Sequence, residues 1–344
     1  MVEVAPAPRR PSSDPTHNPN PFPAGRPHGS ARCAFWGELH SPMNAQRWQL
    51  GHGKVIRLDR PRVVAIFNLT PDSFADGGAL PTPSAVRGRA ERDVRDGAAM
   101  IEVGGESTRP GAERVDAGTQ IERLIPAIEA IRSAGGPLAE IPIGVDTTRA
   151  EVARAAIEAG ADAINDVSAG TEDPAMFELA AQTGAGLVLM HRLDPPERDQ
   201  FSDQYTHPPD YGDVVGEVRR FLEERLSAAT DAGVDQSSIV LDPGLGFGKT
   251  VEQNLELVRR TGELLGLGRP VMSAASRKSF VGRVGLDRDS DPGERLAASV
   301  ALTVLHARAG ARLMRVHDVG AHMQALRMLA ALSEQAPDGD IPGP

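Results

Sequence analysis

The sequence predicts a single (β/α)8 TIM barrel, an α/β fold, and three observations carry that prediction. Short apolar runs alternate with stretches of helical spacing, strand then helix, eight times. The alternation fills residues 54–334, close to the roughly 250 residues that are usual for this fold. Hydrophobic residues make up 40% of the chain and aromatic residues only 4%. The core must therefore consist of Val, Ile, Leu and Ala, as in a parallel sheet.

Each apolar run marks an expected strand, and the stretch after it an expected helix. The strands are expected at 63–68, 99–103, 141–145, 162–166, 186–190, 238–241, 270–274 and 311–316. The helices are expected near 84–97, 119–134, 149–159, 174–182, 213–232, 252–265, 293–309 and 319–332. A doubly wound open sheet is the rival architecture. It requires no count of eight, and no GxGxxG follows the first strand, so the barrel is favoured.

The segments outside the barrel have a different composition. Residues 1–35 are rich in Pro, Ser, Asn and Arg without periodicity, which predicts a disordered extension. Residues 36–53 are interpreted as a lead-in segment with a short hairpin, and 335–344 as a polar tail. The N-terminus has no apolar stretch typical of a secretory signal, and no run approaches the roughly 18 apolar residues of a membrane span. We therefore expect a soluble, cytoplasmic protein without a membrane partner.

Charge and rare residues exclude some classes of protein. The formal net charge of −10 argues against nucleic acid as the main partner. Cys33 is the only cysteine, which rules out an intramolecular disulfide and Cys-rich metal centres. Only three of the 37 basic residues are lysines, namely Lys54, Lys249 and Lys278. A lysine in so arginine-rich a chain points to a role that guanidinium cannot take.

Polar residues follow every expected strand, at the end of the barrel where this fold carries its chemistry. A single aspartate after a strand is more often a helix cap. Eight sets in register are harder to explain by capping, so they predict a site. The sets are Asn68; Thr108 and Arg109; Asp146; Asn165 and Asp166; Met190 and His191; Asp242; Ser276–Ser279; and Arg315 with His317.

Seven motifs occur in order along the barrel: NLTPDSFADGG (68–78), VGGESTRPGAE (103–113), VDT (145–147), INDVSAG (164–170), LDPGLGFGK (241–249), SRKSF (276–280) and RVHDV (315–319). Together they resemble the motifs of the dihydropteroate synthase family of pterin-binding TIM barrels. That resemblance implies the condensation of 6-hydroxymethyl-7,8-dihydropterin pyrophosphate with p-aminobenzoate to 7,8-dihydropteroate and pyrophosphate. It also implies Mg²⁺ as the cofactor, a place in folate biosynthesis, and a homodimer formed through the late helices.

For the pterin end of the site, the resemblance implies five residues. Asp242 accepts two hydrogen bonds from the guanidine-like edge of the ring, Asp146 and Asn165 complete its polar rim, and Met190 stacks on it. The alternative for Asp242 is a purely structural turn in Asp-Pro-Gly. Lys278 reaches the pterin from the loop after 270–274.

For the pyrophosphate, the resemblance implies Arg315 and His317. Arginine can bind a phosphate bidentately and histidine can donate to another oxygen. Asn68 supplies an amide oxygen to Mg²⁺, which prefers oxygen ligands and often bridges phosphates. The alternative for His317 is a core histidine at the barrel mouth. No dedicated protein cage is expected for the metal, so it should bind mainly with the pyrophosphate.

For p-aminobenzoate, the resemblance implies a pocket between three loops. Its members are Thr108, Arg109, Pro110, Phe247, Lys278 and Ser279, with Asp72 and Phe74 from a first loop whose glycines permit movement. Arg315, His317, Lys278 and Asp72 are the expected catalytic residues. The pattern implies loss of pyrophosphate before the amine attacks. The alternative for residues 104–111 is a simple connection from strand to helix.

Two departures from the family pattern and three rival functions remain open at this point. Ala274 stands where the family usually has glycine, and its methyl could crowd the pterin. The loop after 186–190 reads RLDPPERDQFSDQ, which is atypical. A pterin-binding methyltransferase would not need the p-aminobenzoate residues, and a non-catalytic paralogue would be expected to lose Arg315, Lys278 or Asp72. A generic phosphate-binding barrel would use a glycine-rich loop in place of SRKSF.

Overall fold

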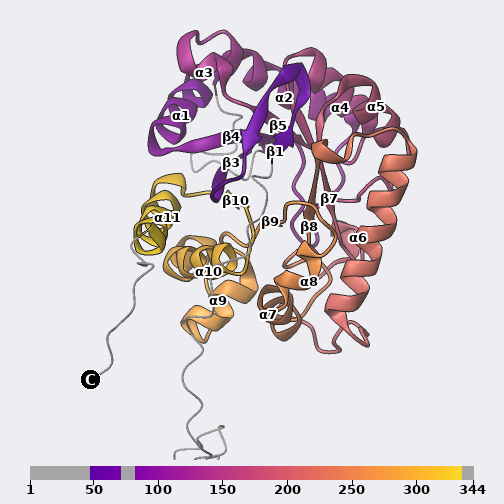
Figure 1. Cartoon of the computed structure of the whole chain (residues 1–344), viewed down its shortest axis with the longest axis vertical. Coiled ribbons are helices and arrows are strands. Elements are labelled where there is room, and N and C mark those ends of the chain that lie inside the picture. Colours follow the sequence, from indigo (N-terminus) through magenta and orange to yellow (C-terminus); the bar gives the residue numbers. More distant parts are fainter. Residues whose placement is uncertain (1–46, 71–81, 335–344) are drawn as a thin grey trace, which may run out of the picture. The chain divides into compact units, whose positions relative to one another are not determined.

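The computed structural model describes residues 47–70 and 82–334, and most of them build a barrel of parallel strands (Figure 1). The barrel strands are β3 Arg62–Asn68, β4 Ala98–Gly104, β5 Ile143–Asp146, β6 Ala163–Asp166, β7 Gly186–Met190, β8 Ile239–Asp242, β9 Met272–Ser273 and β10 Leu313–Val316. In the described residues these eight strands are hydrogen-bonded in the order β8-β7-β6-β5-β4-β3-β10-β9. A parallel bridge between Leu241 and Val271 joins the two edges. The predicted barrel is confirmed.

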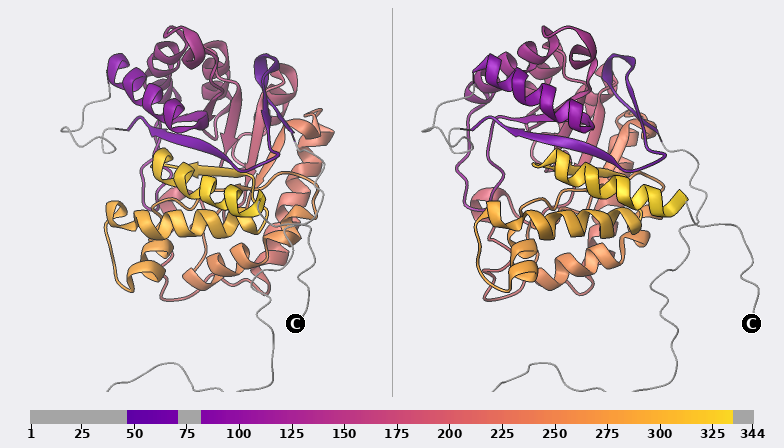
Figure 2. Two further views of the ribbon diagram at one scale, coloured as in Figure 1. Left: turned by 60° about the vertical axis from the view of Figure 1, so that its left-hand side comes forward. Right: turned by 90° about the vertical axis from the view of Figure 1, so that its left-hand side faces the viewer.

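Helices surround the strands, as Figures 1 and 2 show. They are α1 Pro83–Asp96, α2 Ala117–Arg132, α3 Gly136–Glu140, α4 Ala150–Glu158, α5 Ala175–Thr183, α6 Val214–Asp231, α7 Val251–Arg259, α8 Thr261–Leu265, α9 Ser279–Leu286, α10 Leu296–Arg308 and α11 Val319–Glu334. Local capping sets several helix starts. Thr82 accepts the Ala85 N–H at 3.2 Å before a proline, and Asp116 accepts the Thr119 N–H at 2.9 Å. The helices pack their apolar faces against the outward side chains of the strands in one continuous core.

A hairpin covers the N-terminal end of the barrel. Strand β1 (Arg47–Gln49) pairs antiparallel with β2 (Val55–Arg57). The indole of Trp48 is fully buried among interior residues of the barrel such as Val64 and Met100. Its Nε1 donates to the Ser238 carbonyl at 2.8 Å, which satisfies the one polar atom of the ring. Among the described residues, the hairpin thus lies at the end of the barrel where the strands begin.

Several elements differ from the sequence prediction. Helix α3 was not predicted, and β2 lies beyond the segment 36–53 in which the hairpin was expected. The helix expected over 252–265 is divided into α7 and α8, because Arg260 departs from helical geometry at φ −103°, ψ 23°. The strand expected at 270–274 has only two residues, because Pro270 has no N–H for the ladder and Ala274 already belongs to the loop. Helix α9 was not predicted, since its sequence SFVGRVGL is short and contains two glycines.

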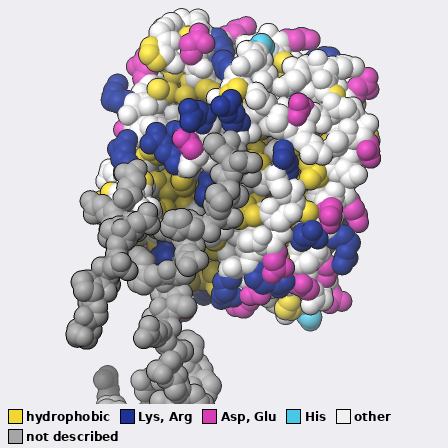
Figure 3. Space-filling view, in the orientation of Figure 1, with side chains coloured by type: hydrophobic (Ala, Val, Ile, Leu, Met, Phe, Trp, Pro, Cys, Tyr) yellow, Lys and Arg dark blue, Asp and Glu magenta, His cyan; other side chains and the backbone are white. Residues whose placement is uncertain are grey.

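The predicted disordered extension, the polar tail and Cys33 lie outside the described residues. Within the described ranges, no helix combines the length and apolarity needed to cross a bilayer. Figure 3 shows acidic and basic side chains interspersed over the face that is viewed in Figure 1. The negative net charge of the chain is therefore not gathered into one acidic region on that face.

Candidate active site

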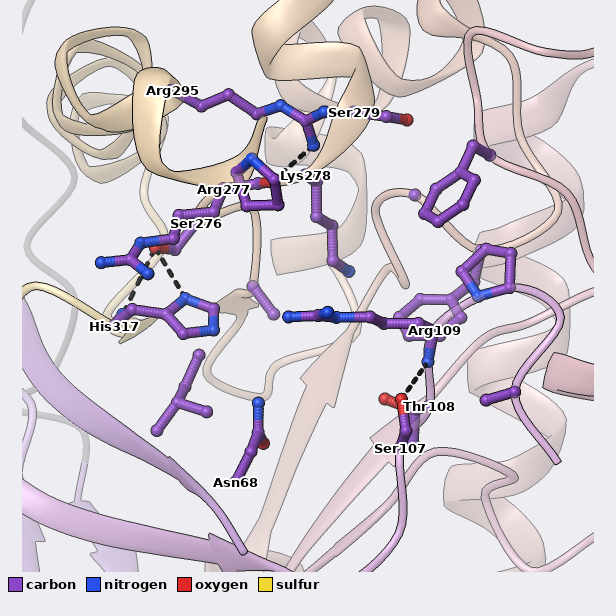
Figure 4. Close-up of a pocket in the computed structure, with 18 of the residues that line it drawn as sticks. Asn68, Ser107, Thr108, Arg109, Ser276, Arg277, Lys278, Ser279, Arg295 and His317 are labelled. Carbon is purple, nitrogen blue, oxygen red and sulfur yellow. Dashed lines mark hydrogen bonds between the residues drawn. The ribbon is translucent and has the colours of Figure 1, made fainter. Parts of the chain in front are cut away.

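A cavity of about 610 Å³ lies among the loops at the carboxyl ends of the strands (Figure 4). Nine residues that were expected in the site line it: Asn68, Thr108, Arg109, Pro110, Phe247, Lys278, Ser279, Arg315 and His317. These residues belong to β3 and β10 and to the segments after β4, β8, β9 and β10. The other predicted residues of the pterin end are buried and are not among those that line the cavity: Asp146, Asn165, Met190 and Asp242. Ala274 lines the same cavity, whereas Asp72 and Phe74 lie outside the described residues.

Arg315 on β10 is held between two carboxylates in the barrel interior. Its Nη2 donates to Asp146 Oδ2 at 2.6 Å, and its Nε donates to Glu102 Oε1 in an ion pair. Glu102 and Asp146 are 2% and 6% exposed. Burial alone would lower the pKa of Arg315, but the two carboxylates outweigh it and raise that pKa. The guanidinium is therefore charged at every accessible pH.

Two buried oxygens beside this arginine have no donor. Glu102 Oε1 also accepts from Asn165 Nδ2 at 3.3 Å, so the amide of Asn165 turns its Oδ1 away from Glu102. Asn165 Oδ1 and Asp146 Oδ1 are both buried and neither has a hydrogen-bond partner in the described structure. An unsatisfied buried acceptor destabilises a protein by about 1–3 kcal/mol. Two of them together indicate a binding place for a ligand rich in N–H donors.

The pKa of Asp146 also lies close to neutral pH. Burial raises the pKa of its carboxyl group to about 7, against the opposing charge of Arg315 and with the help of Glu102. The carboxyl can thus change its protonation state near neutral pH. Donors from a ligand would favour the ionised form.

Asp242 on β8 lies opposite Lys278. Asp242 is 1% exposed, and its Oδ1 accepts the Gly244 N–H at 2.7 Å. The turn in Asp-Pro-Gly is therefore real, and it coexists with a carboxylate directed to the interior. Burial raises the pKa of Asp242, and the Lys278 ammonium opposes this. Burial likewise lowers the pKa of Lys278 to about 7, although Asp242 counteracts it.

Lys278 and Phe247 lie in contact in the wall of the cavity. The Lys278 ammonium lies 4.1 Å from the centroid of the Phe247 ring, a cation–π contact, and it donates to the Leu245 carbonyl. The other side of Phe247 packs in a small apolar cluster with Met190 and Val167. A flat ring entering beside Met190 would consequently meet Lys278 at its edge.

His317 is neutral in this environment. Burial lowers its pKa to about 3, and the charges of Arg277 and Arg315 act in the same direction. The Ser276 hydroxyl accepts the His317 backbone N–H at 3.3 Å and lies 3.2 Å from Nδ1. When that hydroxyl donates to Nδ1, the ring keeps its proton on Nε2 and can donate it. Figure 4 shows the ring near Asn68 at the edge of the cavity.

Two residues of the strand-end sets have structural roles instead. Asp166 accepts the Ser168 and Gly170 N–H groups at 2.8 and 2.6 Å, so it closes its own turn. Arg277, the neighbour of Lys278, forms a forked pair with Asp318 at 2.9 and 2.5 Å. Arg277 nevertheless lines the cavity, whereas Asp166 does not.

The loop after β4 carries Thr108–Pro110 and is anchored to the loop after β7. The Gly111 N–H donates to the Pro196 carbonyl at 2.7 Å. Figure 4 shows Arg109 extending into the cavity from the side of Ser107 and Thr108. The loop with the atypical sequence RLDPPERDQFSDQ contributes Phe201, Asp203 and Gln204 to the cavity wall. The departure from the family pattern therefore lies within the site.

Two residues were not assigned a role from the sequence. Glu102 was not predicted at all, and Lys249 was singled out as a rare lysine without a function. Lys249 is fully buried, and its Nζ donates to the carbonyls of Gly244 and Phe247 at 3.0 and 2.8 Å and lies 3.0 Å from His191 Nδ1. Burial lowers its pKa to about 7. The rarity of lysine was the available signal for Lys249. For Glu102, the signal was a charged residue inside the apolar run AMIEV.

The described residues contain no group of three or more His, Cys, Asp or Glu side chains placed to hold a metal ion. Asn68 does line the cavity, close to His317 (Figure 4). One amide oxygen fits a metal that keeps most of its waters and takes its other ligands from a phosphate.

The chain matches a known class of protein. A family model described as pterin binding enzyme matches residues 64–317. This span contains nearly all of the barrel and every expected site residue of the described structure. The barrel is therefore a pterin-binding barrel by family, and the cavity at its strand ends is the candidate site.

The individual relatives of the chain identify the particular family within this class. The chain is 44% identical over 274 residues to the dihydropteroate synthase of Synechocystis, with 79% of this chain and 90% of the relative covered. The solved dihydropteroate synthase of Xanthomonas albilineans with 4-aminobenzoic acid has a TM-score of 0.75 at 40% identity, covering 85% of this chain and 100% of that one. Its complex with 7,8-dihydropteroate has a TM-score of 0.72 at 38% identity, with 85% and 100% covered. The chain belongs to the dihydropteroate synthase family and is an enzyme of that family.

The tight turn after β8 gives a first prediction. Gly244 has a φ of +67°, and a Cβ built on it would lie 1.7 Å from the His191 carbonyl oxygen. We expect Gly244→Ala to lower the free energy of unfolding by at least about 2 kcal/mol more than Gly268→Ala. Gly268 is a matched control, because its φ is +73° and no atom lies within 4 Å of its built Cβ. Urea unfolding measures both, and equal losses would contradict the prediction.

Proposed function

We propose that the protein condenses 6-hydroxymethyl-7,8-dihydropterin pyrophosphate with p-aminobenzoate to 7,8-dihydropteroate and pyrophosphate, a step of folate biosynthesis. One observation carries the proposal: Asp146 Oδ1 and Asn165 Oδ1 are buried acceptors that have no hydrogen-bond donor in the described structure, and Asp242 is buried as well. A pterin presents a row of N–H donors, which such acceptors can bind. The aminobenzoate and dihydropteroate in the related Xanthomonas structures support the assignment of both substrates.

The pterin ring would lie between Met190 and Lys278, with its donor edge on Asp242. Asp146 and Asn165 would accept from the remaining N–H groups of the ring. The ring is neutral and these three side chains are acceptors, so this end of the site would repel a phosphate. The substrate can then enter in one orientation only.

The pyrophosphate would lie at Arg315 and His317. The guanidinium supplies a permanent charge, and the neutral imidazole supplies an N–H donor from Nε2. We propose Mg²⁺ as the cofactor, held by the Asn68 amide oxygen together with the pyrophosphate, where it would neutralise charge on the leaving oxygens. These donors strengthen as the leaving group becomes more negative, an electrostatic contribution of several kcal/mol in other enzymes.

The aromatic amine would bind in the cavity at the strand ends. Thr108, Arg109 and Pro110 form one side of it, Phe247 and Lys278 another, and Ser279 at the start of α9 would donate to the carboxylate. The resemblance also implies Asp72 and Phe74 for this pocket, and both lie outside the described residues. The cavity, with Lys278 and Phe247 in its wall, supports this place for the second substrate.

The reaction would proceed by dissociation. The bond between the exocyclic methylene and the pyrophosphate oxygen breaks, and the electron pair leaves with pyrophosphate. The pterin ring delocalises the positive charge, and Asp146 and Asp242 stabilise it through the hydrogen bonds they accept from the ring. The amine nitrogen then forms the new bond to the methylene and releases one proton. No nucleophile of the protein is required.

The rival functions are less well supported. A pterin-binding methyltransferase would share Asp146, Asn165 and Asp242 but would not need Thr108–Pro110 beside Lys278 and Ser279. These residues line one cavity here. A non-catalytic paralogue would be free to lose Arg315 or Lys278, and both are present in the site. Ala274 lines the cavity, and its effect on pterin binding stays a prediction.

Assembly and location complete the proposal. We propose a homodimer that forms through the late helices, where large apolar side chains are exposed on neighbouring helices: Leu305 on α10 at 50%, and Met328 and Leu332 on α11 at 63% and 60%. Exposed apolar groups of this size are typical of interfaces. We also propose a cytoplasmic location, in keeping with a sequence that contains a single cysteine.

The activity itself is the second prediction. With Mg²⁺ and both substrates, we expect dihydropteroate and pyrophosphate in equal amounts, and no dihydropteroate without p-aminobenzoate. Lys278→Ala should lower kcat/KM for p-aminobenzoate by about 100-fold, because the wall of its pocket loses the ammonium. Product chromatography and a coupled pyrophosphate assay measure both. Pterin binding without any product at high enzyme concentration would favour the non-catalytic or methyltransferase alternatives.

A third prediction concerns pH. Asp146 must be ionised to accept from the pterin, and burial raises its pKa to about 7. The affinity for 6-hydroxymethylpterin should therefore be full above pH 7 and fall by up to about tenfold per unit below it. Titration calorimetry between pH 5.5 and 8 measures this. Asp146→Asn should bind more weakly and show a flatter profile, and a constant affinity in the unaltered protein would refute the role of Asp146.

The dimer gives a fourth prediction. Leu305→Glu combined with Met328→Glu places two like charges in each half of the proposed interface, so the protein should become monomeric. Val55→Glu, on the hairpin and 41% exposed, is the control and should leave the mass unchanged. Sedimentation velocity distinguishes the two. A monomer in the unaltered protein would rule the dimer out.

A further inference from the structure

Glu102 occupies an unusual place between the two ends of the proposed substrate site. It lies in the middle of β4 rather than in a loop, and it is 2% exposed. Its Oε1 alone accepts from both Arg315 Nε and Asn165 Nδ2. One oxygen thus touches the residue proposed for the pyrophosphate and a residue proposed for the pterin.

The first consequence concerns charge. Arg315 carries one positive charge, and it is in ion pairs with two carboxylates, Glu102 and Asp146. The group of three therefore has a net charge of about −1 when both acids are ionised. A pyrophosphate that approaches Arg315 must compete with Glu102 for the same guanidinium. Glu102 consequently weakens the attraction of this end of the site for any phosphate.

The second consequence concerns orientation. An amide side chain can turn either its oxygen or its nitrogen toward a ligand. Because Asn165 Nδ2 donates to Glu102, its Oδ1 is left free and buried. The side chain therefore presents an acceptor to the place where the ring donors are expected. Without the carboxylate, nothing among these contacts would prevent the opposite orientation.

We propose that Glu102 is a positioning residue with two effects: it fixes Asn165 as an acceptor for the pterin, and it limits the affinity of Arg315 for pyrophosphate so that this product is released. The inference rests on the proposed function, since it assigns the two substrate ends as above. It adds a residue within the barrel interior that need not touch either substrate.

Ligand binding at each end of the proposed substrate site can be measured separately. Titration calorimetry with inorganic pyrophosphate and Mg²⁺ probes the Arg315 end, and 6-hydroxymethylpterin, which has no phosphate, probes the other. Glu102→Gln removes the charge but keeps an oxygen acceptor at the same length. We expect it to bind pyrophosphate about tenfold more tightly and 6-hydroxymethylpterin within about threefold of the unaltered protein. The inhibition constant for pyrophosphate in turnover should fall by the same factor.

A second substitution separates the two effects. Glu102→Met removes both the charge and the acceptor, so pyrophosphate should again bind more tightly, while 6-hydroxymethylpterin should bind about tenfold more weakly. The matched control is Glu106→Gln. Glu106 belongs to the loop that follows β4 and accepts the Val115 N–H at 2.6 Å, and the ion pair described for it is with Arg114. We expect this variant to keep both affinities.

The outcomes are distinct. Pyrophosphate affinity that is unchanged or weaker in Glu102→Gln would overturn the charge effect, and parallel loss of both affinities would show a merely structural role and overturn the whole inference. Unchanged pterin binding in Glu102→Met would overturn the orientation effect. If the unaltered protein bound neither probe and formed no product, the proposed function itself would fail. Binding of both probes by the unaltered protein separates that failure from a failure of the role given to Glu102.

Discussion

The ion pairs of Arg315 with Glu102 and Asp146 are the interaction on which the rest of the site depends. Burial raises the pKa of the Asp146 carboxyl group, because a buried site penalises the charged form. The guanidinium opposes that tendency and has a raised pKa itself. It therefore allows carboxylate oxygens in the barrel interior to serve as acceptors. If Arg315 were lost, an uncompensated negative charge would remain in the core, a change that costs about 3–5 kcal/mol in other proteins.

The parallel strands make this arrangement possible because their register sets side chains at one level. Asp146 on β5 pairs with Asn165 on β6, and Met190 on β7 pairs with Asp242 on β8. Four neighbouring strands thus present polar and apolar groups in one ring around the interior. Glu102 lies two residues before the end of β4 and so occupies a deeper layer. The site consequently has a floor of paired charges beneath a rim of acceptors.

The sequence predicted those parts of the structure that depend on local pattern. Strand and helix order followed from periodicity, and the expected residues Asp146, Asn165 and Asp242 could be placed because they end apolar runs. The direction of the Glu102 side chain depends on strand register and barrel closure, which no local pattern reveals. Burial of Lys249 depends in the same way on His191, which is 58 residues away in the sequence. Helix α9 was not predicted, because its two glycines disfavour a helix. Tertiary packing nevertheless stabilises it.

The buried charges also explain why one site could serve two chemically different substrates. Lys249 is fully buried and is held by carbonyl oxygens and an imidazole, so it fixes the turn that carries Phe247 without taking part in the Arg315 group. Phe247 and Lys278 lie in contact in the cavity wall, whereas the acceptors Asp146, Asn165 and Asp242 are buried and do not line that cavity. A neutral ring with N–H donors is favoured at those acceptors, whereas an anionic benzoate would be repelled there by Asp146 and Asp242. Under the proposed function, the same electrostatic difference would orient the pterin and would keep the aromatic amine in the cavity, outside the buried acceptors.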